Sequence, residues 1–146
     1  MNREERIAQE IKEFEEWKDT INCEGNPKIE DSIWNITING PLDSPYVGGK
    51  FKIRITLPKG YPTEKPIFQF LTDICHMNIK GKNICLDSLN YYNSDYSIIQ
   101  ILTQIFMMLT SPNEESPLNW DYYQLYLKDE DEYFEKAREM TRQHAK

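Results

Sequence analysis

The positions of apolar residues predict a helix at the start of the chain. Within residues 3–21, Ile7, Ile11 and Phe14 recur at helical spacing and leave the charged residues on the opposite face. The segment Gly25-Asn26-Pro27 is expected to end this stretch, because glycine and proline interrupt helices.

The middle of the chain alternates apolar and polar residues, which predicts half-buried strands. The alternation runs over residues 33–39 and again over KFKIRITLP at 50–58, where Ile53 lies on the apolar face and is expected to be a core residue. IFQFL at 67–71 predicts a third strand. A short strand near residues 28–30 would complete an antiparallel meander of four strands.

Three more helices are expected in the second half of the chain. Residues 97–110 are apolar on most sides, which predicts a central helix. Asn119 is expected to cap a helix over residues 120–127, and Asp129 with Glu132 forms the capping-box pattern of a last helix.

Residues 72–96 follow neither periodicity and are rich in Asn, Asp, Gly and Ser. Irregular segments of this length in compact domains are usually functional or disordered. Four apolar residues are available to anchor it to a core: Ile79, Ile84, Leu86 and Leu89. We therefore expect a functional loop within an α+β fold, and one domain spanning residues 1–146.

Composition narrows the range of partners. The chain has 146 residues, 39% of them hydrophobic, which is enough for a substantial core. A net charge of −7 disfavours a general nucleic-acid or membrane-surface binder, because both need clustered Lys and Arg. No run approaches the roughly 18 apolar residues of a membrane span, and the charged start disfavours a signal peptide. We expect a cytoplasmic or nuclear protein that meets other proteins.

Cysteine chemistry is the most informative feature of the irregular segment. Cys23, Cys75 and Cys85 cannot all pair within the chain and lack CxxC spacing, so in a reducing compartment they would be free thiols. A cysteine nucleophile needs access and hydrogen-bond donors where negative charge develops. Asn78, seven positions before Cys85, offers an amide donor, and Asp87, two positions after it, could lie near an incoming amine. Cys85 could then accept an acyl group by thioester exchange.

Other interpretations of Cys85 stay open at this level. It could be an ordinary buried thiol. A Cys–His hydrolase would take His76 or His144 as its base, although no Asn or Asp is obviously placed to orient either ring. A zinc site made of Cys75, His76 and Cys85 lacks a fourth ligand and paired spacing.

Five segments, spread in order over almost the whole chain, are RIAQEIKEF, IWNITINGPLDSPYVGGKFKIRITLPKGYP, HMN, ICLD and SPNEESPLN. Together they resemble the ubiquitin-conjugating enzyme family. RIAQEIKEF resembles the first helix of the family, and IWNITINGPLDSPYVGGKFKIRITLPKGYP is similar to its second and third strands with the turn between them. HMN resembles the His-Pro-Asn motif, ICLD the active-site segment, and SPNEESPLN the loop after the central helix. Each is weak alone, but five in the right order around a cysteine are specific. The resemblance implies the UBC fold, with an N-terminal helix, a four-stranded antiparallel meander sheet, an irregular active-site loop, a central helix and two C-terminal helices.

The resemblance also implies a mechanism without cofactor or metal. Cys85 would accept the C-terminal carboxyl of ubiquitin as a thioester from an activating enzyme and pass it to a substrate lysine or a ligase. Asn78 matches the motif asparagine, which stabilises the oxyanion or braces the loop. Asp87 matches an acidic position near the incoming lysine, and Ser116 occupies the gate position that helps to orient that lysine. His76 is then expected to fix the loop structurally.

The chain departs from the family pattern on both sides of the cysteine. Met77 replaces the proline of the motif, and the segment from Asn78 to Cys85 is one residue shorter than usual.

Two alternative functions follow from the resemblance. The modifier could be a relative of ubiquitin, since the contact with the activating enzyme largely decides the modifier. The chain could also be a non-catalytic adaptor with the same fold, which the presence of Cys85 disfavours.

The end of the domain that binds ligases in the family also differs. NYYNSDYS replaces the Trp-Ser-Pro segment of many members, and Thr63 and Glu64 stand where ligase-binding members often expose an apolar residue. Tyr91, Tyr92 and Tyr96 could form a different contact surface or pack against the neighbouring helix.

Overall fold

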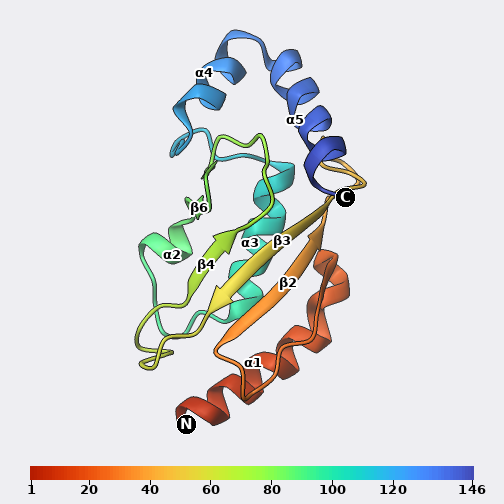
Figure 1. Cartoon of the computed structure of the whole chain (residues 1–146). Helices are drawn as coiled ribbons and strands as arrows, with labels where there is room; N and C mark the ends of the chain where they lie inside the picture. The colour runs from red at the N-terminus through yellow and green to blue at the C-terminus, as the bar shows by residue number, and fades with distance from the viewer.

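The computed structural model describes residues 1–146 and confirms the α+β architecture (Figure 1). The strands are β1 (Cys23–Gly25), β2 (Ile33–Asn39), β3 (Lys50–Thr56), β4 (Ile67–Phe70), β5 (Ile79–Lys80) and β6 (Asn83–Ile84). The helices are α1 (Arg3–Trp17), α2 (Asp87–Asn90), α3 (Ile98–Thr110), α4 (Trp120–Lys128) and α5 (Glu130–His144), and a 3-10 turn, η1 (Lys18–Ile21), follows α1. None of these helices combines the length and apolar character that crossing a membrane requires.

Strands β1 to β4 form one antiparallel sheet in sequence order, as the meander prediction required. The period of two in β2 and β3 places their apolar residues on a single face, where Ile36 pairs with Ile53 and Trp34 with Ile55. Ile53 has no exposed surface, which confirms it as a core residue. Lys50 and Lys52 of β3 lie on the other face and are exposed.

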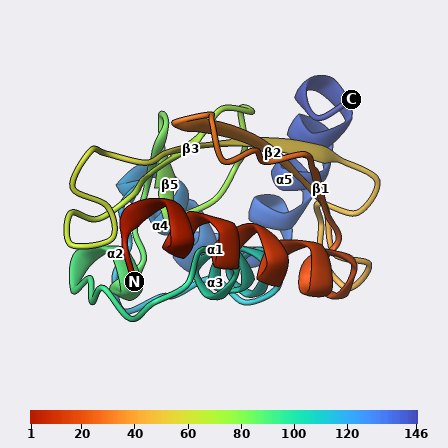
Figure 2. The same cartoon turned by 90° about the horizontal axis from the view of Figure 1, so that it is seen from below.

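Helices α1 and α3 lie side by side beneath the apolar face of the sheet (Figure 2). In addition to apolar contacts, one buried carboxylate links α1 to α3. Glu10 of α1 accepts hydrogen bonds from the backbone N–H of Ile98 (2.7 Å) and from Nε of Arg6 (2.8 Å). Burial raises the pKa of the Glu10 carboxyl. The first residue of α3 is thereby fixed against α1.

Helices α4 and α5 form the C-terminal end of the molecule (Figure 1). Asn119 caps α4 as predicted, because its side chain accepts from the N–H of Tyr122. Asp129 likewise caps α5 by accepting from the N–H of Glu132. The reciprocal bond from the Glu132 side chain is absent, so the predicted capping box is only half formed.

The predicted N-terminal boundaries were wrong in two places. Helix α1 ends at Trp17, and the chain turns through η1 to Asn22, which has a left-handed backbone (φ 53°). Ile21 lies in η1, but its side chain is still buried in the core. Its position in the sequence therefore continues the helical spacing of α1, although α1 has already ended. The chain therefore reverses before Gly25, and the first strand lies at Cys23–Gly25. The predicted strand at residues 28–30 is a turn.

The stretch expected to be irregular, residues 72–96, contains regular structure in two places. Strands β5 and β6 form a small hairpin, and α2 is a single helical turn directly after it. Both are too short to show a periodicity in the sequence. Together they carry the residues around Cys85.

Candidate active site

A tight hairpin places Asn78 opposite Cys85. In β5 and β6, Ile79 pairs with Ile84, and the two-residue turn has Gly81 at its first position with φ 61°. Glycine favours this conformation because it has no Cβ. The N–H of Cys85 donates to the carbonyl oxygen of Asn78 at 2.9 Å, which extends the pairing by one residue. The short connection between these two residues is therefore closed by a hairpin.

The side chain of Asn78 is buried and fully hydrogen-bonded. Its Nδ2 donates to the carbonyl oxygens of Asn113 (2.9 Å) and Ser116 (3.0 Å), and its Oδ1 accepts from the N–H of Asn113 (2.9 Å). An amide NH₂ has two protons to donate, and both are used here. Asn78 thus joins the hairpin to the loop after α3.

His76 is also buried and held on both sides of its ring. Nδ1 accepts from the N–H of Asn78 at 3.0 Å, so Nε2 carries the proton and donates to the carbonyl oxygen of Met108 at 2.8 Å. Burial lowers the pKa of His76 to about 4. A neutral ring with both nitrogens occupied is placed to hold the loop against α3 and has no free nitrogen for a thiol.

Met77 stands at the position of the motif proline and keeps an N–H that proline lacks. This N–H is buried and donates to the hydroxyl of Tyr133 in α5 at 3.1 Å. The carbonyl oxygen of Met77 accepts from the N–H groups of Leu118 and Asn119, both at 2.8 Å. The segment is therefore fixed from α5 and from the start of α4.

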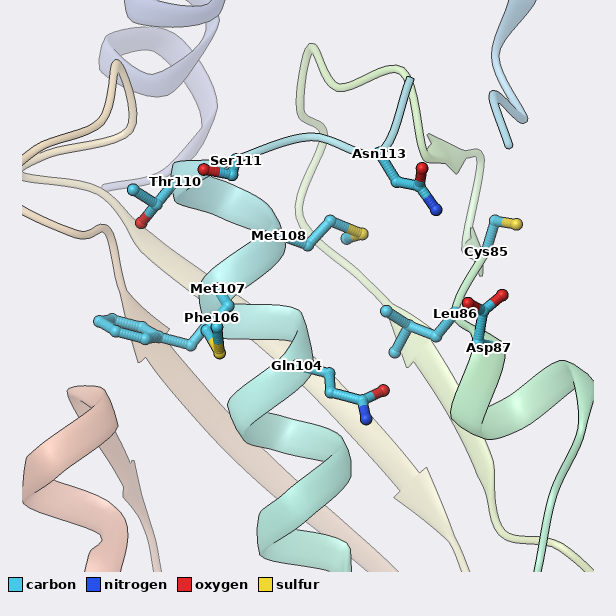
Figure 3. Close-up of a pocket in the computed structure, with 10 residues that line it drawn as sticks. All are labelled: Cys85, Leu86, Asp87, Gln104, Phe106, Met107, Met108, Thr110, Ser111 and Asn113. Atoms are coloured by element: carbon cyan, nitrogen blue, oxygen red, sulfur yellow. The ribbon is translucent and has the colours of Figure 1, made fainter. Parts of the chain in front are cut away.

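Cys85 differs from the other two cysteines in its access to solvent. Its side chain is partly exposed, whereas Cys23 and Cys75 are buried, and burial raises the pKa of each of those two thiols to about 12. Cys85 lies beside an open hollow of about 480 Å³. Figure 3 shows Cys85, Leu86 and Asp87 on one wall of this hollow, with α3 on the other and Asn113 at the top.

The structure brings only some of the predicted site residues together. Asp87 is exposed, begins α2 and lines the same hollow as Cys85 (Figure 3). Ser116 does not line it, although its carbonyl oxygen accepts from Asn78. The catalytic roles of Cys85, Asn78, Asp87 and Ser116 stay predictions that this geometry constrains.

Two residues near the site had no signal in the sequence. The side chain of Asn90, at the end of α2, donates from Nδ2 to Sγ of Cys85 at 3.6 Å. Tyr133 contacts Met77 from 56 positions away. Finding Asn90 would have required the one-turn helix α2, and finding Tyr133 would have required the docking of α5.

The structure does not have the geometry that a Cys–His hydrolase or a zinc site at Cys85 would need. His76 is occupied by backbone groups, and His144 is an exposed residue at the end of α5. No group of three or more His, Cys, Asp or Glu side chains in residues 1–146 is arranged to hold a metal ion. Cys75 instead directs its thiol to the carbonyl oxygen of Tyr133.

The three tyrosines after α2 differ in how far their side chains are buried. Tyr92 packs inward and donates its hydroxyl proton to the carbonyl oxygen of Pro62 at 2.7 Å. Tyr96 meets the Tyr92 ring edge-on, and Tyr91 is 78% exposed. Tyr92 is thus a structural residue, whereas Tyr91 is available for contact.

The fold and this arrangement of a hairpin, a partly exposed cysteine and a buried His-x-Asn are those of a ubiquitin-conjugating domain. The family model for ubiquitin-conjugating enzymes matches residues 6–141, and the chain belongs to this family. Among solved structures, the chain is similar to the E2 domain of a Toxoplasma gondii ubiquitin conjugating enzyme, with 27% sequence identity and a TM-score of 0.87. That match covers 99% of this chain and 100% of the other. Family membership implies ubiquitin, activating enzymes and ligases as general partners.

Proposed function

We propose that this chain is an active ubiquitin-conjugating enzyme and that residues 1–146 form its catalytic domain. Cys85 accepts ubiquitin as a thioester from an activating enzyme and transfers it to a substrate lysine or to a ligase cysteine. The observation that carries this proposal is the partial exposure of the Cys85 thiol, beside an open hollow, while the other two thiols are buried. Family membership supplies the reaction class.

The reaction consists of two acyl exchanges. In the first, the Cys85 thiolate attacks the carbonyl carbon of the activating enzyme's thioester, a C–S bond to Cys85 forms, and the activating enzyme's thiolate leaves. In the second, a lysine amine attacks the same carbon, a C–N bond forms, and the Cys85 thiolate leaves. The amine proton passes to solvent. A thioester is reactive enough that this aminolysis depends mainly on positioning, and Asp87, on the wall that carries Cys85, is the acidic residue to orient the amine.

The charging reaction tests this function. Wild-type protein, ubiquitin, activating enzyme and ATP should give an adduct that reducing agent removes. Cys85→Ala should give none, and Cys85→Ser should give an adduct that resists reducing agent, because an oxyester replaces the thioester. Cys23→Ala is the matched control, since its thiol is buried, and it should charge like the wild type. An unchanged adduct in Cys85→Ala would disprove the assignment of the nucleophile.

The identity of the modifier is tested in the same assay. Ubiquitin and its relatives, each with its own activating enzyme, are offered in parallel, and we expect ubiquitin to load fastest. Faster loading of a relative would reassign the modifier without changing the chemistry at Cys85. An adduct that free lysine never discharges would instead favour an adaptor.

A further inference from the structure

The hydrogen-bond donors near Cys85 are not those that the sequence motif suggests. Asn78 is the residue of the motif, but both protons of its amide bind the carbonyl oxygens of Asn113 and Ser116. The group has no exposed surface. To donate to a thioester oxygen, it would have to release two hydrogen bonds that hold the loop after α3. Both bonds stabilise the loop, and breaking them would leave two buried carbonyl oxygens without partners, which is unfavourable.

Asn90 offers the donor that Asn78 lacks. Its Nδ2 lies 3.6 Å from Sγ of Cys85, at hydrogen-bond distance for sulfur, and its side chain makes no other hydrogen bond within residues 1–146. One of its two amide protons is therefore directed at the sulfur, and the other is free. The carbonyl oxygen of a thioester is two bonds from its sulfur, so a small rotation of this side chain carries the donor from the sulfur to the oxygen.

The backbone holds Asn90 in this position. Its N–H donates to the carbonyl oxygen of Leu86 at 2.9 Å, which closes the single turn of α2. The preceding residue, Leu89, accepts at its carbonyl oxygen from Nζ of Lys65 at 3.2 Å. The side chain is thus free to adjust, while its Cα is fixed close to the cysteine.

We propose that Asn90 is a catalytic residue of the transfer reaction, whose side-chain amide donates to the thioester oxygen as the tetrahedral intermediate forms and to the Cys85 sulfur as the thiolate leaves. This inference rests on the proposed function. As the amine attacks, the carbonyl oxygen becomes an oxyanion and accepts from Nδ2. When the C–S bond breaks, the same amide stabilises the leaving sulfur. Asn90 neither gains nor loses a proton.

The size of the effect follows from exposure. Removing a buried oxyanion donor slows catalysis about 10²–10³-fold. Asn90 is exposed, so water weakens its contribution. We expect Asn90→Ala to slow the discharge of ubiquitin to lysine about tenfold, which is less than the effect of a buried oxyanion donor because water competes for the same oxygen.

The test is a single-turnover discharge assay. Protein is charged with ubiquitin, ATP is removed, and loss of the thioester is followed over a range of lysine concentrations. In Asn90→Ala the maximal rate should fall about tenfold while the lysine concentration at half-maximal rate stays unchanged, because the donor acts in the transition state. Asn90→Asp keeps the shape but has no N–H to donate, and should be at least as slow. Asn83→Ala, another exposed asparagine close to Cys85, should discharge at the wild-type rate.

Thermal unfolding separates catalysis from structure. Asn90→Ala should melt within about a degree of the wild type, because a surface change away from the core has little effect on stability. Normal charging with unchanged discharge in both Asn90 variants would overturn the role of Asn90 and leave the proposed function intact. A wild-type protein that never charges at Cys85 would overturn the proposed function, and the role of Asn90 with it.

Discussion

The N–H of Met77 donates to the hydroxyl of Tyr133, 3.1 Å away, and thereby ties the segment before the candidate nucleophile to α5. In the family motif a proline occupies this position, and proline has no N–H to satisfy. The substitution by methionine creates a buried donor, and the hydroxyl of Tyr133 is its acceptor. Loss of the proline's fixed φ angle is therefore offset by a contact from outside the loop.

Tyr133→Phe should destabilise the fold by about 1–3 kcal/mol, because it leaves the N–H of Met77 buried without a partner. The ring contacts of Tyr133 with Tyr126 and Phe134 are kept in this variant, so packing is preserved. The free energy of unfolding from urea titration measures the effect.

The matched control removes the donor. In a Met77→Pro background no N–H remains at this position, so Tyr133→Phe should cost markedly less than it does in the wild type. The difference is the coupling energy of the pair. Costs that add within about 0.5 kcal/mol would mean that the hydroxyl and the N–H do not interact.

A second prediction concerns Asn78. Asn78→Asp keeps the size of the side chain but removes both N–H donors and brings a carboxylate close to two carbonyl oxygens. It should lower the free energy of unfolding by about 3 kcal/mol, as expected for an uncompensated buried group. Asn78→Ala should cost about 1–3 kcal/mol. Denaturant titration of both variants, with Asn83→Ala as the exposed control, checks this. Stability equal to the wild type would show that the amide does not brace the loop.

The longer elements of the fold were predictable because their periodicity reflects burial. Alternation over β2 and β3 gave their position and the face that each buries, and β2 was placed at its observed ends. Strand β1 was misplaced because three residues cannot show a period, and because Ile21 continued the helical spacing beyond the end of α1. Local pattern decides an element only when the element is long enough to repeat it.

In the candidate site, too, some features could be predicted from the sequence and others could not. From the sequence, Asp87 was expected near an amine approaching Cys85, and the structure shows that both residues line one hollow. The motif did not show that both amide protons of Asn78 are used. The contact of Asn90 with Cys85 depends on a single helical turn. The contact between Met77 and Tyr133 depends on how α5 docks. Neither relationship follows from local sequence, because both are properties of the tertiary structure.

The core assignment gives a third prediction. Ile53→Ala should destabilise the protein by about 2–5 kcal/mol, since the side chain is fully buried at the centre of the sheet and its removal leaves a cavity. Arg54→Ala, the next residue in β3, should have a much smaller effect because its side chain lies on the opposite face. Thermal melts of the two variants compare the faces directly. An Ile53→Ala protein as stable as the wild type would contradict the strand register.

The last prediction concerns pH. The pKa of His76 is lowered to about 4 in the folded protein by burial, from an ordinary value of 6.5. Below pH 6.5 the unfolded chain binds a proton at this residue that the folded chain does not bind. Stability from this group is therefore complete above pH 6.5 and is lost as the pH falls towards 4, by about 3 kcal/mol in all.

A non-titrating variant isolates the contribution of His76. The pKa of the Glu10 carboxyl is raised by burial, so its contribution runs the opposite way and is lost as the pH rises. The total pH profile of unfolding thus mixes both groups. His76→Gln should be less stable than the wild type at pH 7, because it loses ring hydrogen bonds to Met108 and Asn78. The stability difference between the two proteins should shrink between pH 6.5 and pH 4, since only the wild type carries the cost of keeping His76 neutral. A difference that stays constant over this range would show that His76 titrates as in the unfolded chain and is not the buried neutral ring that holds the loop.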